Sequence, residues 1–354
     1  MAKINEKRTL FFAPERVFER LATQKPTLEY KNEESWHKKA QAKLNELLFG
    51  TGKIPRAIYD PLFIKKGTQS YRIEFLTEPD SLVIGRLELP PTKTKVPLII
   101  CLQGHTLDRK GKSVGIDSLF GEGTKEDREY YLRRGINTAE QALALGYATL
   151  AIEQRGFGER KDQRDSESQA HYGGRCHNPS MGSILYGRTI IGDRVRDVSA
   201  FITTIIKLTR AHQLPIDITR IALVGHSGGG TTAYYAAATD TRIKAVMASG
   251  SVCQFDQSIA MIDHCVCNYI PHIREYFEIG DIGCLIAPRP LIIVHGEHDP
   301  NFPIAGVRKA LVSLKKAYKD RHAKSNLSIV LGDGVHQFFP ELAWPAFNKI
   351  SGWK

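Results

Sequence analysis

The sequence predicts an α/β fold: a mostly parallel central sheet flanked by helices. Strand-like and helix-like segments alternate over residues 95–354, as expected for right-handed crossovers between parallel strands. The run VPLIICL at 96–102 is continuously apolar, which is typical of a strand buried on both faces of a parallel sheet. A glycine-rich turn, GHSGGG at 225–230, joins one strand-like segment directly to a helix-like one. The 354 residues fit one large domain with insertions.

Residues 1–60 are expected to form an N-terminal helical extension to a main domain at 61–354. Within this extension Trp36, Ala40, Leu44 and Leu47 recur at intervals of three and four residues, and Gly50 follows as a helix stop.

The main domain is expected to open with an antiparallel hairpin, because residues 71–78 and 81–89 carry apolar positions on either side of a polar turn. Further strands are expected at 95–105, 147–154, 220–226, 243–250, 289–297 and 326–332, and helices at 137–146, 192–213, 231–239, 306–319 and 341–350. Residues 156–190 and 251–280 interrupt this alternation after strand ends, where open parallel sheets bind ligands. We interpret both as insertions that form the walls of a pocket.

The net charge of +11 and the pI near 9.3 come from scattered lysines and arginines, without the runs or motifs of a nucleic-acid-binding protein. We therefore interpret them as a solvated basic surface. No run reaches the roughly 18 apolar residues of a membrane span, and the N-terminus lacks the apolar core of an export signal. Six cysteines in so long a chain favour a reducing compartment, so we expect a soluble cytoplasmic protein without nucleic-acid or membrane partners.

Ser227 lies in a G-x-S-x-G sequence between a strand and a helix, the position of the nucleophile in a strand-turn-helix elbow. Small residues are needed on both sides because the turn forces the serine into a strained backbone conformation. The helix that follows directs its amides and dipole at the reacting oxygen.

Two partners for Ser227 follow in the chain, each just after a strand: Asp299 in GEHDP and His336 in DGVH. A serine hydroxyl needs an imidazole to take its proton, and the imidazole needs a carboxylate to fix its tautomer. The order serine, aspartate, histidine favours a catalytic triad. Asp256 and Asp263, which follow the preceding strand, are alternative acids.

Backbone amides for a developing oxyanion are expected from Gly228, directly after the nucleophile, and from the end of the strand at 95–105. There we favour the amide of His105, with that of Gly104 as the alternative. The His105 side chain is open to two interpretations, a substrate ligand or a plain loop residue.

Taken together, GHSGGG, GEHDP, GVH, LQGH and EQRGFGER make the chain from about residue 70 to 354 resemble the α/β-hydrolase superfamily, and within it the dienelactone hydrolase and acetyl xylan esterase branch. The resemblance implies an α/β-hydrolase fold with Ser227 as nucleophile, His336 as base, Asp299 as its orienting acid, and His105 and Gly228 as oxyanion donors. A serine stands where dienelactone hydrolases carry a cysteine, which favours ester substrates.

A metal site is considered at His264, Cys265 and Cys267, with Cys253 and His272 nearby. A single C-x-C without a second spaced pair favours packing over zinc, so no metal and no organic cofactor are expected.

Four residues are candidates for substrate binding. Arg155 follows a strand and is directed either at a substrate or at acidic neighbours of the first insertion. The insertions supply the other three, His177, Tyr186 and Tyr269, and the first insertion also carries His171 and Tyr172.

The sequence thus predicts a serine hydrolase that cleaves small-molecule carboxylic esters through an acyl-enzyme. The acyl group is expected to be short, such as acetyl, and a carbohydrate is one candidate for the alcohol. Two alternatives remain: a peptidase related to prolyl oligopeptidases, and an inactive hydrolase scaffold that only binds a ligand.

Overall fold

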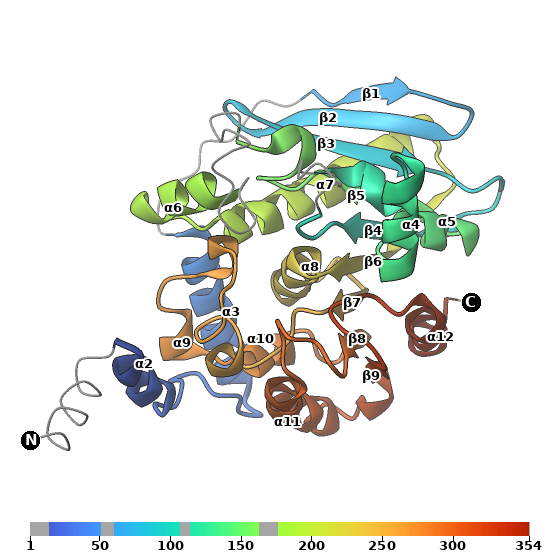
Figure 1. The fold of residues 1–354 in the computed structure, drawn as a ribbon. Helices are drawn as coiled ribbons and strands as arrows, with labels where there is room; N and C mark the ends of the chain where they lie inside the picture. The colour runs from blue at the N-terminus through green and yellow to red at the C-terminus, as the bar shows by residue number, and fades with distance from the viewer. Residues whose placement is uncertain (1–13, 51–59, 107–113, 163–175, 354) are drawn as a thin grey trace, which may run out of the picture.

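A computed structural model describes residues 14–50, 60–106, 114–162 and 176–353 (Figure 1). Its centre is a nine-stranded sheet with the order β1-β2-β3-β5-β4-β6-β7-β8-β9. Neighbouring strands are antiparallel from β1 to β5 and parallel from β5 to β9. The strands are β1 (Leu62–Lys65), β2 (Ser70–Glu78), β3 (Ser81–Glu88), β4 (Val96–Leu102), β5 (Ala148–Ile152), β6 (Ile216–His226), β7 (Ala245–Ser249), β8 (Leu291–Gly296) and β9 (Leu327–Gly332).

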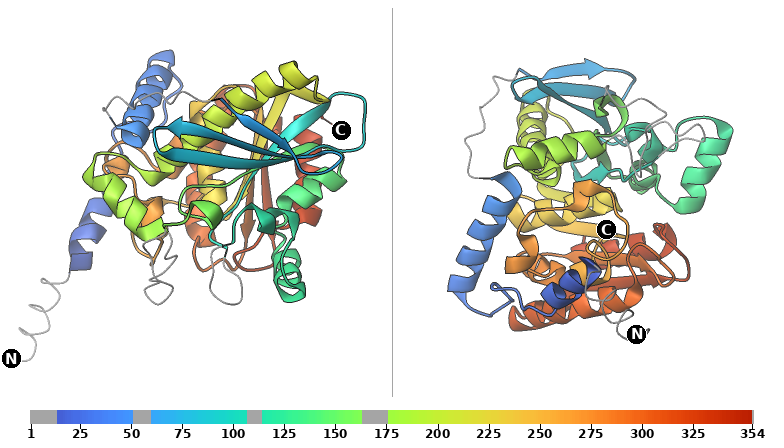
Figure 2. Two further views of the ribbon diagram at one scale, coloured as in Figure 1. Left: turned by 90° about the horizontal axis from the view of Figure 1, so that it is seen from above. Right: turned by 60° about the vertical axis from the view of Figure 1, so that its left-hand side comes forward.

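Helices cover both faces of the sheet (Figures 1 and 2). The larger hydrophobic core contains residues of α3 (Glu34–Phe49), α7 (Ile190–His212), α8 (Gly228–Thr239), α9 (Ile273–Tyr276), α10 (Ile279–Cys284) and α11 (Ile304–Asp320). The smaller core, on the opposite face, contains residues of α5 (Thr138–Ala144) and α12 (Pro340–Ser351). The remaining α-helices of the described chain are α2 (Pro14–Ala22), α4 (Lys125–Arg134) and α6 (His177–Leu185).

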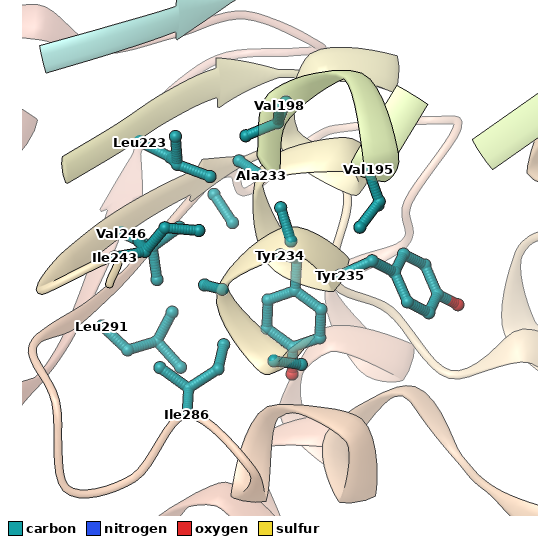
Figure 3. Packing of buried hydrophobic residues seen from close by; sticks show 14 of the residues in the cluster. Val195, Val198, Leu223, Ala233, Tyr234, Tyr235, Ile243, Val246, Ile286 and Leu291 are labelled. Carbon is teal, nitrogen blue, oxygen red and sulfur yellow. The ribbon is translucent and has the colours of Figure 1, made fainter. Parts of the chain in front are cut away.

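Alternate residues of the central strands point into opposite cores, because side chains in a strand alternate between its two faces. In β6, Leu223 belongs to the larger core, whereas its neighbours Ala222 and Val224 belong to the smaller one. Figure 3 shows the larger core, where Leu223 and Val246 of the sheet face α7 and α8. This two-sided burial explains why the strands are continuous apolar runs in the sequence.

The N-terminal helix α3 is part of the larger core. It buries Trp36, Ala40, Leu44 and Leu48, so Leu48 takes the core position that the sequence analysis gave to Leu47. The helix ends at Gly50, whose φ of 69° suits glycine and whose amide donates to the Glu46 carbonyl. Figure 2 shows α2 and α3 in blue at one side of the molecule.

The predicted α/β fold class is confirmed, and the hairpin and the alternating strands and helices lie where the sequence placed them. Five described strands and α-helices were not predicted: β1, α4, α6, α9 and α10. Helix α4 has no apolar periodicity, but its capping box of Thr124 and Asp127 is visible in the sequence and could have revealed its start. Among the described residues, no helix has the length and apolar character needed to span a membrane.

Candidate active site

Ser227 stands at the sharp turn between β6 and α8, in a backbone conformation that is rare for a residue with a side chain. Its φ is 56° and its ψ is −123°. Its amide donates to the Ser249 carbonyl over 2.8 Å, and its own carbonyl accepts from the Thr231 amide over 2.9 Å. A Cβ on Gly225 would overlap the backbone of Gly229, so the turn requires glycine there. The surrounding structure thus fixes a strained serine at the edge of the sheet.

Asp299 and His336 form a hydrogen-bonded pair in the loops that follow β8 and β9. The distance from His336 Nδ1 to Asp299 Oδ2 is 2.7 Å. The other carboxylate oxygen accepts the amides of Asn301 at 2.8 Å and Phe302 at 3.1 Å. Burial of Asp299 raises its pKa, but these hydrogen bonds and the charge of His336 outweigh burial and hold the pKa below its usual range. The carboxylate therefore stays ionised beside the imidazole.

The His336 ring lies among other rings in the same pocket as Ser227. Its centroid is 4.5 Å from that of His226 and 5.7 Å from that of Phe302, whose ring stacks on it. Among the hydrogen bonds of the described chain, none joins Ser227 to His336. Unliganded active sites often have long contacts of this kind.

The two alternative acids are not paired with His336. Asp263 lines the pocket around Ser227, and Asp256 lines a separate, largely apolar pocket beside α2. The structure therefore pairs His336 with Asp299 rather than with either of them.

The loop after β4 lies against the serine turn. A Cβ on Gly104 would lie 2.8 Å from the His226 carbonyl oxygen and 3.0 Å from Ser227 Cβ, so only glycine allows this approach. The position of a Cβ on Gly228 is 3.4 Å from His105 Nδ1. The chain at Gly104 and His105 therefore borders the start of α8.

Hydrogen bonds among buried polar side chains hold this loop in place. The Gln103 carbonyl accepts a hydrogen bond from Gln154 Nε2, and Gln154 Oε1 accepts one from Thr232 Oγ1 in α8 over 2.6 Å. The Gln103 side chain donates to Glu153, which also accepts the Ile116 amide over 3.2 Å. Sequence reasoning missed this network, although the polar pair EQ at the end of a predicted strand was visible in the sequence.

Glu153 is almost completely enclosed, with 1% of its surface exposed. Burial raises the pKa of Glu153 to about 8, while the Ile116 amide acts in the opposite direction. At neutral pH this carboxyl is therefore mostly protonated and can donate a hydrogen bond as well as accept one.

The pocket that contains Ser227 and His336 has a volume of about 300 Å³. One wall comes from the second insertion, through Asp263, His264, Cys265 and Asn268. Further lining comes from the segment between the end of β4 and the first residue of α5, a part of the chain that the sequence analysis did not identify as pocket-forming. Its lining residues there are Thr106, Ser118, Leu119, Tyr130, Arg134, Ile136 and Thr138.

None of the described residues of the first insertion lines this pocket, and the four predicted substrate-binding residues lie elsewhere. His177 begins α6, Tyr186 follows that helix with 87% of its surface exposed, and Tyr269 lines the apolar pocket beside α2. His171 and Tyr172 lie outside the described residues.

Arg155 is the centre of a buried ion-pair network. Its guanidinium donates to Asp197 over 2.9 and 3.0 Å and to Glu78 over 2.5 Å. Arg160 and Arg188 pair with the same two carboxylates. Of the two interpretations of Arg155, the structure therefore agrees with the one that ties it to acidic neighbours.

The candidate metal residues of the sequence analysis separate into two groups. His264 Nε2 lies 3.0 Å from the Asn301 carbonyl oxygen, Cys253 contacts Pro303, and His272 pairs with Glu275 at the surface. Cys265 and Cys267 instead meet two residues from distant segments, His105 and Cys176, in one compact cluster.

The charge state of this cluster favours a thiolate. Hydrogen bonds from Cys176 and Cys265 outweigh burial and lower the pKa of Cys267 well below its usual value, and His105 and Arg194 contribute positive charge. Burial would lower the pKa of His105, but Cys267 and Cys265 outweigh it and raise the pKa to about 10.

Comparison with known proteins gives two sequence matches. A family model for the alpha/beta hydrolase fold matches residues 130–265. The "Putative hydrolase YtaP" of Bacillus subtilis (strain 168) is 29% identical over 203 residues, which cover 56% of this chain and 62% of that protein. The chain thus matches less than two thirds of the length of this relative.

Solved structures match over almost the whole chain. A "putative acetyl xylan esterase" from Bacteroides fragilis superposes with a TM-score of 0.74 at 19% identity, covering 96% of this chain and 95% of that one. A glucuronoyl esterase from Solibacter usitatus gives a TM-score of 0.62 at 14% identity, with coverage of 93% and 97%. At these identities the likeness establishes the fold.

Proposed function

We propose that this chain, which has the α/β-hydrolase fold and matches its family model over residues 130–265, hydrolyses carboxylic esters through an acyl-enzyme formed on Ser227. One observation carries this proposal: an ionised carboxylate orients His336 in the same pocket that contains a strained, elbow-positioned serine. That arrangement suits general-base activation of a hydroxyl nucleophile.

In the proposed reaction His336 Nε2 takes the proton of Ser227 while the serine oxygen attacks the ester carbonyl carbon. Asp299 keeps the proton on Nδ1 and stabilises the imidazolium that forms. His336 then gives its proton to the departing alkoxide, which leaves as the alcohol. A water, activated by the same imidazole, hydrolyses the acyl-enzyme and releases the acid.

The negative charge on the tetrahedral intermediate needs fixed donors. We assign this role to the amide of Gly228, at the N-terminus of α8, and to the amide of His105. The close approach of Gly104 to Ser227 and the support from Gln103 and Gln154 favour this assignment.

For the substrate, we propose a short acyl group such as acetyl, carried by a polyhydroxylated alcohol. The volume of about 300 Å³ suits a small ester, and Tyr130, Arg134 and Asn268 offer an aromatic surface and hydrogen-bond donors for hydroxyl groups. Two solved structures of similar fold are carbohydrate esterases by name, which supports the same substrate class.

The test compares the natural protein with Ser227→Ala on a panel of p-nitrophenyl esters, acetylated sugars and peptide amides. We expect ester hydrolysis that a serine-directed fluorophosphonate abolishes, with the label on Ser227. The Ser227→Ala variant should keep its melting temperature and lose at least roughly 10⁴-fold in kcat. Faster cleavage of peptide amides would favour a peptidase, and absence of both turnover and labelling would favour an inactive binding scaffold.

A further inference from the structure

We propose that His105, Cys176, Cys265 and Cys267 form a Cys₃His site for one structural Zn²⁺ beside the active-site pocket. Their ligand atoms all lie within 4.8 Å of one another. His105 is in the loop after β4, Cys176 directly precedes α6, and Cys265 and Cys267 flank the start of a short 3₁₀ turn, Val266–Asn268. Three segments far apart in the sequence thus converge on one point.

The spacing within the cluster is closer than apolar packing would produce. Cys176 Sγ lies 2.9 Å from Cys265 Sγ, whereas carbon atoms in apolar contact have their optimal separation at about 3.5–4.0 Å. His105 Nε2 lies 3.2 Å from Cys176 Sγ and 3.4 Å from Cys267 Sγ. One imidazole nitrogen directed at two sulfurs, with a third sulfur adjoining, is the donor arrangement of a four-coordinate metal rather than of a hydrophobic contact.

The donor set selects zinc. Three soft thiolates and one imidazole are a common tetrahedral ligand set for structural Zn²⁺, whereas calcium and magnesium require oxygen. With Zn–S near 2.3 Å and Zn–N near 2.0 Å, neighbouring donors would stand about 3.5–3.8 Å apart, so small side-chain shifts from the distances above would suffice. Four protein ligands leave no open position for water, so the ion would not activate a nucleophile.

A buried arginine supplies the positive charge that balances the zinc-bound cluster. The remaining thiol protons and the Nε2 proton of His105 leave to water as the sulfur and nitrogen lone pairs bond to the ion, so His105 coordinates as the neutral imidazole. Zinc with three thiolates then carries one net negative charge. Arg194, with 1% of its surface exposed, interacts with Cys267 and Cys176, and among the described residues no carboxylate pairs with it.

Arg194 is itself fixed in place. Its Nε and Nη2 donate to the Arg155 carbonyl over 3.0 and 2.7 Å, and its guanidinium lies 4.3 Å above the Phe157 ring. The Phe157 ring in turn meets the His105 ring edge-to-face at 4.7 Å. A buried cation with a fixed position therefore lies beside the sulfurs of Cys176 and Cys267.

The ion would join the second insertion and the start of α6 to the loop that carries the amide of His105. It would thus fix the position of a proposed oxyanion donor without touching the substrate. Metal binding itself does not depend on the esterase proposal, because it can be measured on a protein that hydrolyses nothing.

The experiment measures zinc in the purified full-length protein by inductively coupled plasma mass spectrometry and its ligands by X-ray absorption at the zinc edge. We expect about one zinc per chain, with three sulfurs near 2.3 Å and one nitrogen near 2.0 Å. Cys176→Ser and Cys267→Ser should each lower the zinc content at least roughly tenfold after dialysis against a mild chelator. Cys253→Ser, a buried cysteine outside the cluster, should retain the metal.

Two further measurements guard against misfolded variants. Cobalt(II) added to the metal-free natural protein should give the thiolate charge-transfer and visible bands of a tetrahedral site, and zinc should displace them. A chelator should lower the melting temperature of the natural protein. A natural protein without zinc that also binds no cobalt would overturn the proposal, and so would a Cys176–Cys265 disulfide found by non-reducing peptide mapping.

Discussion

His336 Nδ1 lies 2.7 Å from Asp299 Oδ2, and the second oxygen of the same carboxylate is occupied by two backbone amides. The carboxylate is therefore fixed on both sides and can hold only one tautomer of the imidazole, the one with its proton on Nδ1. The free nitrogen, Nε2, is left for chemistry in the pocket.

Replacing Asp299 by Asn should lower kcat for p-nitrophenyl acetate by roughly 10⁴-fold, because an amide can hold the wrong tautomer of His336. The measurement is steady-state kinetics at neutral pH. Asp256→Asn is the matched control and should remain within a few-fold of the natural protein, because Asp256 lies in another pocket. Equal losses in both variants would contradict the assignment of the acid.

Replacing Arg155 by Met should destabilise the protein rather than weaken substrate binding. The change removes the cation shared by Asp197 and Glu78, which are both buried, and should cost about 3 kcal/mol in the free energy of unfolding. Urea unfolding measures this cost. Arg72→Met, which breaks the more exposed pairs with Glu159 and Glu74, should cost less than about 1 kcal/mol. An altered KM with unchanged stability would restore Arg155 as a substrate-binding residue.

Lengthening the acyl group from acetyl to octanoyl should lower kcat/KM at least roughly tenfold, because a small pocket cannot place the longer chain in reacting geometry. A series of p-nitrophenyl acetate, butanoate and octanoate tests this trend on the natural protein. A preference for octanoate would indicate an open, lipase-like groove and would leave the proposed triad unaffected.

Replacing Glu153 by Gln should change how stability depends on pH. Burial raises the folded-state pKa of Glu153 to about 8, above its ordinary value of 4.5. Between these values the unfolded chain loses the proton and the folded protein keeps it, so rising pH lowers the stability of the natural protein by at most about 1.4 kcal/mol per unit.

The Glu153→Gln variant lacks this titration. Its melting temperature relative to that of the natural protein should therefore rise from pH 5 to pH 8. Asp117, Glu159 and Arg160 are the charged groups around Glu153 and are unchanged in both proteins. A difference that stays constant with pH would mean that Glu153 is ionised in the folded state.

The sequence was sufficient to predict which site residues lie at the carboxyl ends of the strands. Ser227, Asp299 and His336 each follow a predicted strand, and parallel strands bring their carboxyl ends to one edge, so their meeting in one region could be foreseen. The alternation of apolar runs likewise predicted most of the sheet, because both of its faces are buried.

Contacts between residues that loops bring together from distant parts of the sequence could not be predicted. Arg155 meets Glu78 and Asp197, which are 77 and 42 positions away, and no periodic pattern links them. Cys176 and Cys267 lie 71 and 162 positions from His105. Tyr130 and Arg134 line the pocket from α4. The sequence of this charged helix has no apolar stripe, so the helix was not predicted.

Helix α3 leaves the ribosome well before its partners in the core are made. The Leu48 carbonyl accepts a hydrogen bond from Thr189, which is 141 positions downstream, and Trp36 and Leu44 belong to a core completed by α7 and α8. At synthesis rates of about 5–20 residues per second, the apolar face of α3 stays exposed for on the order of ten seconds before α7 and α8 are made. During that interval the nascent chain exposes an aggregation-prone apolar segment. A chaperone that binds this segment would prevent association between neighbouring chains.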